Sequence, residues 1–129
     1  VDLYGVAHWI RTLRSIPPYW ESFKKELFDE MGDPNTSDSV MLKAASPLYN
    51  YQKINKPLIV SQGLHDVRVL PIESKEIAEG VKKNCVPVEY ITYANEGHGF
   101  MKKENQITTA EKTLTFLDKY VKGNGEIKK

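Results

Sequence analysis

The chain has little of several things that would point to particular classes of protein. Cys85 is the single cysteine in 129 residues, which excludes an intrachain disulfide and favours a reducing compartment, so we expect a cytoplasmic protein. No hydrophobic run reaches the roughly 20 residues of a spanning helix, so we expect no membrane segment. The net charge of +1 provides no strong field for nucleic acid, which we exclude as a partner.

Ligand spacings for a metal are also missing. The three histidines and Cys85 form no pair with the spacing of a zinc-binding helix or finger. We therefore expect neither a metal site nor another cofactor. No internal repeat or low-complexity segment occurs, and the composition, with 40% hydrophobic and 27% charged residues, is that of an ordinary globular domain.

The periodicity of apolar residues predicts an α/β chain. Strands are predicted at 1–7, 57–63 and 86–93, and helices at 19–31, 37–45, 71–84 and 104–121, with a short helix or loop at 8–15. Alternating strands and helices over the second half imply parallel strands joined by right-handed crossovers. The last helix carries a 3-4-3-4 apolar stripe that we expect to be buried: Ile107, Ala110, Leu114, Leu117 and Val121. Cys85 is expected to be a small buried side chain.

An acid and a histidine follow two successive predicted strands. Asp66 comes a few residues after the strand at 57–63, and His98 follows the strand at 86–93 between Gly97 and Gly99. Because parallel strands end at the same sheet edge and lie about 4.8 Å apart, the two side chains can meet there. This is the order of the acid and base in a Ser…Asp…His triad, although spacing alone equally allows a surface histidine in a turn.

The nucleophile that such a triad needs is missing from the chain. No Gly-x-Ser-x-Gly turn occurs anywhere in the sequence. Ser46 and Ser61 lack flanking glycines, and Ser74 falls within a predicted helix, so none is expected to act as a nucleophile.

The motifs around this pair resemble the C-terminal catalytic segment of the prolyl oligopeptidase family of serine peptidases, of the acylaminoacyl-peptidase and dipeptidyl-aminopeptidase type. The resemblance is carried by Gly63-x-x-Asp66-x-Arg68-Val69, Val86-Pro87-Val88-Glu89-Tyr90 and Glu96-Gly97-His98-Gly99-Phe100. It implies a partial α/β-hydrolase fold with about three parallel strands and flanking helices. It also implies cleavage of peptides or acyl-peptides, with Asp66 and His98 as the catalytic acid and base.

Four further residues are candidates for substrate binding. Trp9, Tyr19 and Trp20 fall in the region that lines the substrate pocket in the resembling family, although packing beneath a loop is an equal alternative for each. Arg68 is a candidate for contacting a substrate carboxylate or orienting the acid loop, whereas a local ion pair with Glu73 or Asp66 is the simpler interpretation. Glu96 is expected to be a solvated or loop-bracing carboxylate.

The beginning of the chain suggests a fragment. Residue 1 is Val, not Met, and the segment 1–7 already has the pattern of a buried strand. We expect residues 1–129 to be one C-terminal piece of a hydrolase catalytic domain, inactive alone, with a strand and pocket-side helices in 1–50 and the acid and base in 51–129. The alternative is a non-catalytic α/β module. In either case we expect a homo-oligomer that pairs through the exposed edge of the strand at 1–7.

Overall fold

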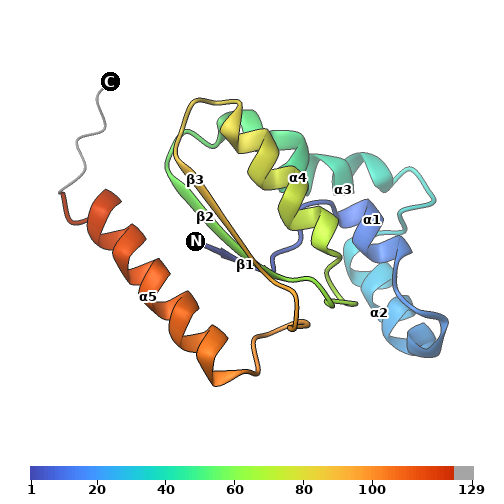
Figure 1. The fold of residues 1–129 in the computed structure, drawn as a ribbon. Coiled ribbons are helices and arrows are strands. Elements are labelled where there is room, and N and C mark those ends of the chain that lie inside the picture. The colour runs from blue at the N-terminus through green and yellow to red at the C-terminus, as the bar shows by residue number, and fades with distance from the viewer. Residues whose placement is uncertain (124–129) are drawn as a thin grey trace.

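The computed structural model describes residues 1–123, which form a three-stranded parallel sheet with helices packed around it. The strand order is β1 (Asp2–Leu3), β2 (Leu58–Gly63), β3 (Val88–Tyr93), and β2 lies in the centre. The predicted α/β architecture with three parallel strands and flanking helices is therefore confirmed (Figure 1).

The register of the two long strands determines where their loops emerge. Leu58 pairs with Val88 at one end, and Gly63 pairs with Tyr93 at the other. Because the strands are parallel and end in register, the loops that follow Gly63 and Tyr93 leave the same edge of the sheet side by side. These two loops carry Asp66 and His98.

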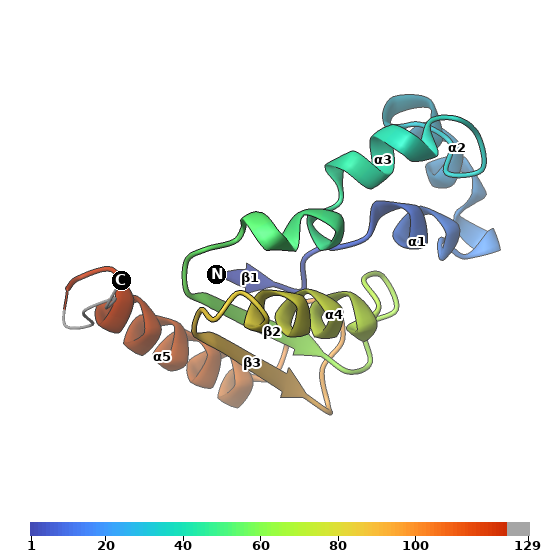
Figure 2. The same cartoon turned by 90° about the horizontal axis from the view of Figure 1, so that it is seen from above.

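Helices α4 (Pro71–Lys82) and α5 (Lys103–Tyr120) lie on opposite faces of the sheet (Figures 1 and 2). Pro71 stands in the first turn of α4, as predicted, because that position needs no N–H donor. Ile77 and Val81 of α4 pack with Ala7 to form the buried hydrophobic cluster of the molecule. No helix in residues 1–123 combines the length and apolarity needed to cross a membrane.

The first half of the chain beyond β1 is helical and lies on the β1 side of the sheet (Figure 2). It contains α1 (Trp9–Arg14), the 3₁₀ turn η1 (Pro18–Trp20), α2 (Glu21–Met31), α3 (Ser39–Ala45) and the 3₁₀ helix η2 (Pro47–Lys53). Gly32, with φ of 105°, ends α2, because a left-handed residue cannot continue a helix. The sequence did not predict η2.

The predicted strand at 1–7 is wrong in its length. Only Asp2 and Leu3 are extended, because Tyr4 turns into the left-handed region with φ of 45°. The Asp2 carboxylate closes this turn by accepting a hydrogen bond from the Gly5 N–H at 2.9 Å. Tyr4 still donates its N–H to the Ser61 carbonyl at 2.8 Å, so the segment leaves the sheet only after that residue.

The predicted burial of the α5 stripe is also wrong. Ile107, Leu114, Leu117 and Val121 are all exposed, the last to 73%. The sheet is instead contacted by an adjacent face of α5 with Phe116, 4% exposed, and Thr109, whose hydroxyl hydrogen-bonds Tyr93 Oη at 2.8 Å. Cys85 is likewise exposed rather than buried, in a left-handed turn with φ of 58°.

Candidate active site

Asp66 lies in the loop after β2, and its carboxylate is almost fully enclosed. The residue is 3% exposed. Oδ1 accepts the backbone N–H groups of Arg68 and Val69, both at 2.9 Å, and Oδ2 accepts a hydrogen bond from Gln62 Nε2 at 3.2 Å. Donors on both oxygens fix the plane of the carboxylate.

His98 lies in the loop between β3 and α5, and Glu96 holds that loop in shape. Glu96 is 3% exposed and accepts hydrogen bonds from Met101 N, Lys102 N and Asn105 Nδ2, the last at 2.7 Å. The Asn105 hydrogen bond is the main cause that lowers the pKa of the Glu96 carboxyl, and the two backbone donors act in the same direction. The loop-bracing role expected for Glu96 is confirmed, and the solvated alternative is wrong.

The two loops bring Asp66 and His98 into direct contact. His98 Nδ1 lies 2.9 Å from Asp66 Oδ2, so the predicted contact is confirmed, while the catalytic roles stay predictions. The Tyr4 ring packs edge-on against the imidazole, with 4.9 Å between the ring centroids. Since 29% of the His98 side chain is exposed and Nδ1 is taken, Nε2 is the nitrogen left for a further partner.

An apolar cavity of about 590 Å³ opens beside His98. Its walls are mostly side chains of α1, η1 and α2, and Arg68 and His98 are the charged and titratable groups of the lining. Two of the sequence candidates, Trp9 and Trp20, line the cavity, whereas Tyr19 does not. Tyr19 is 74% exposed and packs edge-on against Trp20 from outside.

Arg68 does not form the local ion pair that the sequence suggested. Its guanidinium lies over the Trp20 ring, 5.5 Å from the centroid, and lines the cavity. Glu73 pairs instead with Arg11 of α1 at 3.4 Å. The ion-pair interpretation of Arg68 was therefore wrong, and the structure brings this side chain to the same cavity as His98.

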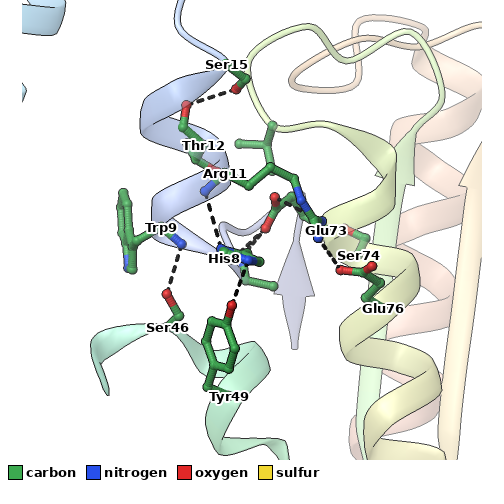
Figure 3. Close-up of polar contacts among 12 residues, drawn as sticks. His8, Trp9, Arg11, Thr12, Ser15, Ser46, Tyr49, Glu73, Ser74 and Glu76 are labelled. Carbon is green, nitrogen blue, oxygen red and sulfur yellow. Dashed lines mark hydrogen bonds and ion pairs between the residues drawn. The ribbon is translucent and has the colours of Figure 1, made fainter. Parts of the chain in front are cut away.

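The buried Glu73 attaches α1 to α4 and so holds one wall of the cavity in place (Figure 3). It is 0% exposed and accepts the backbone N–H groups of Ala7 and His8. Burial raises the pKa of the Glu73 carboxyl, although Arg11 and the two N–H groups act in the opposite direction. On the other side of α1, Ser46 Oγ accepts the Trp9 N–H at 2.9 Å.

None of the three serines weighed as nucleophiles hydrogen-bonds to His98 through its hydroxyl. Ser46 donates to the Leu42 carbonyl at 2.7 Å, and Ser74 donates to Gln62 Oε1 at 2.6 Å. Ser61 Oγ is buried with no hydrogen-bond partner among residues 1–123. Within the same range, no group of three or more His, Cys, Asp and Glu side chains is arranged to hold a metal ion.

Two contacts of the pair were missed by the sequence reasoning. Gln62 donates to Asp66, and Tyr4 packs on His98. The available signal for Gln62 was a large polar residue near the end of the mostly apolar run at 57–63. Tyr4 had no local signal, because only the parallel pairing of β1 with β2 brings it to this edge.

Comparison with known proteins identifies a family and several relatives that the chain resembles. Residues 4–124 match the model of the prolyl oligopeptidase family. The chain is 37% identical over 127 residues to dipeptidyl aminopeptidase BIII of Pseudoxanthomonas mexicana, covering 98% of this chain and 18% of that protein. It is 33% identical over 125 residues to dipeptidyl peptidase family member 6 of Caenorhabditis elegans, covering 95% of this chain and 17% of that protein. The chain thus spans less than a fifth of the length of these relatives.

Solved structures share the fold. A puromycin-hydrolyzing peptidase of Mycobacterium tuberculosis superposes with a TM-score of 0.81 at 23% identity, over 92% of this chain and 18% of that one. The acylaminoacyl peptidase of Pyrococcus horikoshii superposes with a TM-score of 0.77 at 16% identity, over 96% of this chain and 20% of that one.

Proposed function

The chain belongs to the prolyl oligopeptidase family and forms part of an α/β-hydrolase fold, and from this premise we propose that it supplies the acid and base of a Ser-His-Asp triad. Asp66 is the acid and His98 the base of a peptidase. The observation that carries the proposal is the 2.9 Å contact between Asp66 Oδ2 and His98 Nδ1 at the mouth of an apolar cavity. The serine comes from another part of a longer protein.

The geometry suits general-base catalysis. A buried carboxylate on Nδ1 favours the imidazole tautomer that carries its proton there, which leaves the lone pair on Nε2. Nε2 then removes the proton from the serine hydroxyl as the hydroxyl attacks the carbonyl carbon, and returns it to the leaving amine. Asp66 stabilises the imidazolium that forms between these two steps.

The substrate we propose is a peptide or acyl-peptide that places an apolar side chain in the cavity. Trp9 and Trp20 provide flat apolar walls, and most of the remaining lining is aliphatic or aromatic. Arg68, held over Trp20, is the group suited to bind a carbonyl or carboxylate of the substrate. Tyr19, outside the cavity, is proposed to support Trp20 rather than to touch substrate.

Labelling with a fluorophosphonate probe tests this assignment. We expect no labelling of the 129-residue chain, because it contains no Gly-x-Ser-x-Gly turn. A longer protein that includes both this chain and such a turn should be labelled at the serine of the turn. Asp66→Asn in that protein should slow labelling by on the order of 10⁴-fold, since the wrong imidazole tautomer then predominates. Stoichiometric labelling of Ser46, Ser61 or Ser74 in the chain alone would contradict the proposal.

A second candidate is a self-associating α/β module, and the exposed apolar stripe of α5 favours it. Leu114 and Leu117 of the stripe line a groove with Leu3 of β1. The sheet order leaves β1 paired on one side only within the described residues. We propose that a second copy covers this groove and pairs with the open side of β1, as unpaired strand edges tend to do.

A further inference from the structure

Gln62 is a fully buried polar side chain in the central strand. It lies on β2, one residue before the end of the strand, and is 0% exposed. Ile59 and Val60 of the same strand are apolar and buried, and the adjacent Ser61 is buried as well. A buried amide in such a position is costly unless its donors and acceptor are all used, so its partners indicate what it does.

Each polar atom of the Gln62 amide has a partner, and the partners fix its orientation. Nε2 faces three acceptors: Gly63 O at 3.0 Å, Asp66 Oδ2 at 3.2 Å and Val69 O at 3.3 Å. Oε1 accepts the hydroxyl of Ser74, on α4, at 2.6 Å. A flipped amide would bring Oε1 against two carbonyls and a carboxylate, so only one orientation of Gln62 satisfies this environment.

The contact with Asp66 falls on the oxygen that serves His98. Asp66 Oδ1 is held by two backbone N–H groups, whereas Oδ2 receives Gln62 Nε2 at 3.2 Å and His98 Nδ1 at 2.9 Å. Gln62 is therefore the side chain that shares Oδ2 with the imidazole.

We propose that Gln62 is a positioning residue, braced by Ser74, that holds Asp66 Oδ2 at the point where His98 Nδ1 donates. The chain of contacts runs from the Ser74 hydroxyl through the Gln62 amide and the Asp66 carboxylate to the imidazole. Its function is to keep the proton of neutral His98 on Nδ1, so that Nε2 remains the acceptor. This inference rests on the proposed function, because it assigns Gln62 a role in preparing the same base.

The tautomer of His98 reports this role directly, and measuring it requires no enzyme activity. In the ¹⁵N-histidine-labelled chain at about pH 8, where ordinary histidine side chains are neutral, two-bond ¹H–¹⁵N correlation spectra distinguish Nδ1–H from Nε2–H. We expect one Nδ1–H tautomer for His98 with a downfield Hδ1 resonance. Gln62→Met, which keeps the length of the side chain but removes the amide, should cause loss of that resonance and a mixture of tautomers.

A matched control lies one residue away. Ser61 is buried in the same strand, and its hydroxyl has no partner among residues 1–123, so Ser61→Ala should leave the His98 spectrum unchanged. Ser74→Ala provides a milder second variant if Gln62→Met does not fold, as judged by circular dichroism. Because it removes only the brace on Oε1, it should weaken the Hδ1 resonance.

The outcomes separate the two proposals. An unsubstituted chain without the Nδ1–H tautomer would refute the Asp66–His98 pair, and with it this inference. A normal His98 spectrum in folded Gln62→Met, or in Ser74→Ala where Gln62→Met does not fold, would overturn the role of Gln62 and leave the pair intact. In a longer, active protein that contains the chain, Gln62→Met should lower kcat by on the order of 10- to 100-fold with little change in KM.

Discussion

Gly63 ends β2 where the loop that carries His98 passes closest to the strand. A Cβ built at Gly63 would lie 2.3 Å from Gly97 O and 2.5 Å from Glu96 O, which are backbone atoms with little freedom to move. Gly97 differs, because a Cβ there would meet His65 O at 3.6 Å, an ordinary contact. Gly99, with φ of 88°, is the position beside His98 where the backbone itself favours glycine.

We therefore predict that Gly63→Ala is damaging and Gly97→Ala is tolerated. The added methyl at position 63 should destabilise the fold by about 1–3 kcal/mol, because it must push the 95–99 loop away from the strand. Urea unfolding measures the loss, and the His98 Hδ1 resonance reports whether the contact with Asp66 survives. Equal stability of the two variants would show that the close approach at Gly63 does not constrain the loop.

The sequence predicted the acid and the base of the site, because strand topology determines where these two residues lie. Asp66 and His98 each follow a recognisable strand, so parallel pairing allowed their contact, and the resemblance to the prolyl oligopeptidase family favoured it over a surface histidine. Gln62, Tyr4 and the buried position of Glu96 could not be predicted in the same way. Their partners are set by how loops pack after the sheet has formed, and local sequence carries little information about such packing.

At the level of helices and strands, local sequence signals predicted where a helix begins or ends better than which of its residues are buried. Pro71 and Gly32 marked a helix start and a helix end correctly, because each acts through its own backbone. The stripe on α5 was a true periodic pattern, but periodicity states which residues share a face and not which surface covers that face. The predicted length of β1 was wrong because Tyr4 adopts a left-handed conformation that non-glycine residues rarely take, in a turn closed by the Asp2–Gly5 hydrogen bond.

Helix α1 begins at a capping side chain that can titrate, His8. His8 Nδ1 accepts the N–H of Arg11 at 3.3 Å, and Tyr49 Oη lies 3.0 Å from His8 Nε2 (Figure 3). Nδ1 can accept only while it carries no proton, so the cap requires neutral His8. Burial, with a contribution from the nearby Arg11, lowers the pKa of His8 below its ordinary value of 6.5, in agreement with that requirement.

This cap predicts a pH-dependent stability. Between the lowered folded pKa of His8 and 6.5, the unfolded chain binds more protons than the folded chain, so the free energy of unfolding should rise with pH through that window. His8→Asn keeps a capping oxygen and does not titrate, so it should remove this part of the pH dependence. Urea unfolding of both forms at a series of pH values provides the comparison. Parallel curves for the two forms would mean that the His8 cap has no linkage to pH.

At the level of the whole molecule, an exposed apolar groove lies between α5 and β1. Leu114 is 57% exposed and Leu117 36%, and Leu3 of β1, 43% exposed, lines the same groove. Contiguous apolar surface of this kind marks an interaction site or an aggregation liability in many proteins. β1 extends over only two residues, so pairing through its edge adds few hydrogen bonds and the groove must supply most of the attraction.

If the chain associates through this groove, it should form a dimer, and a charged side chain introduced into the groove should disrupt that dimer. In sedimentation velocity at micromolar concentration, the chain should sediment above the monomer mass, and Leu114→Asp should return it to monomer. Lys112→Ala is the control, because position 112 is exposed on the opposite face of α5 and should leave the mass unchanged. A monomer at all concentrations, or equal effects of the two variants, would refute the second candidate function.

The central claim is that His98 is the base of a peptidase, and turnover of a peptide substrate tests it most directly. The measurement compares His98→Ala with His65→Ala in a longer, active protein that contains this chain. His65 is the matched control, because it neighbours Asp66 but is exposed, and its described contact is made through its backbone. The account predicts a loss of kcat on the order of 10⁴-fold or more for His98→Ala in a folded protein, and unchanged turnover for His65→Ala. Near-normal turnover by His98→Ala would contradict it.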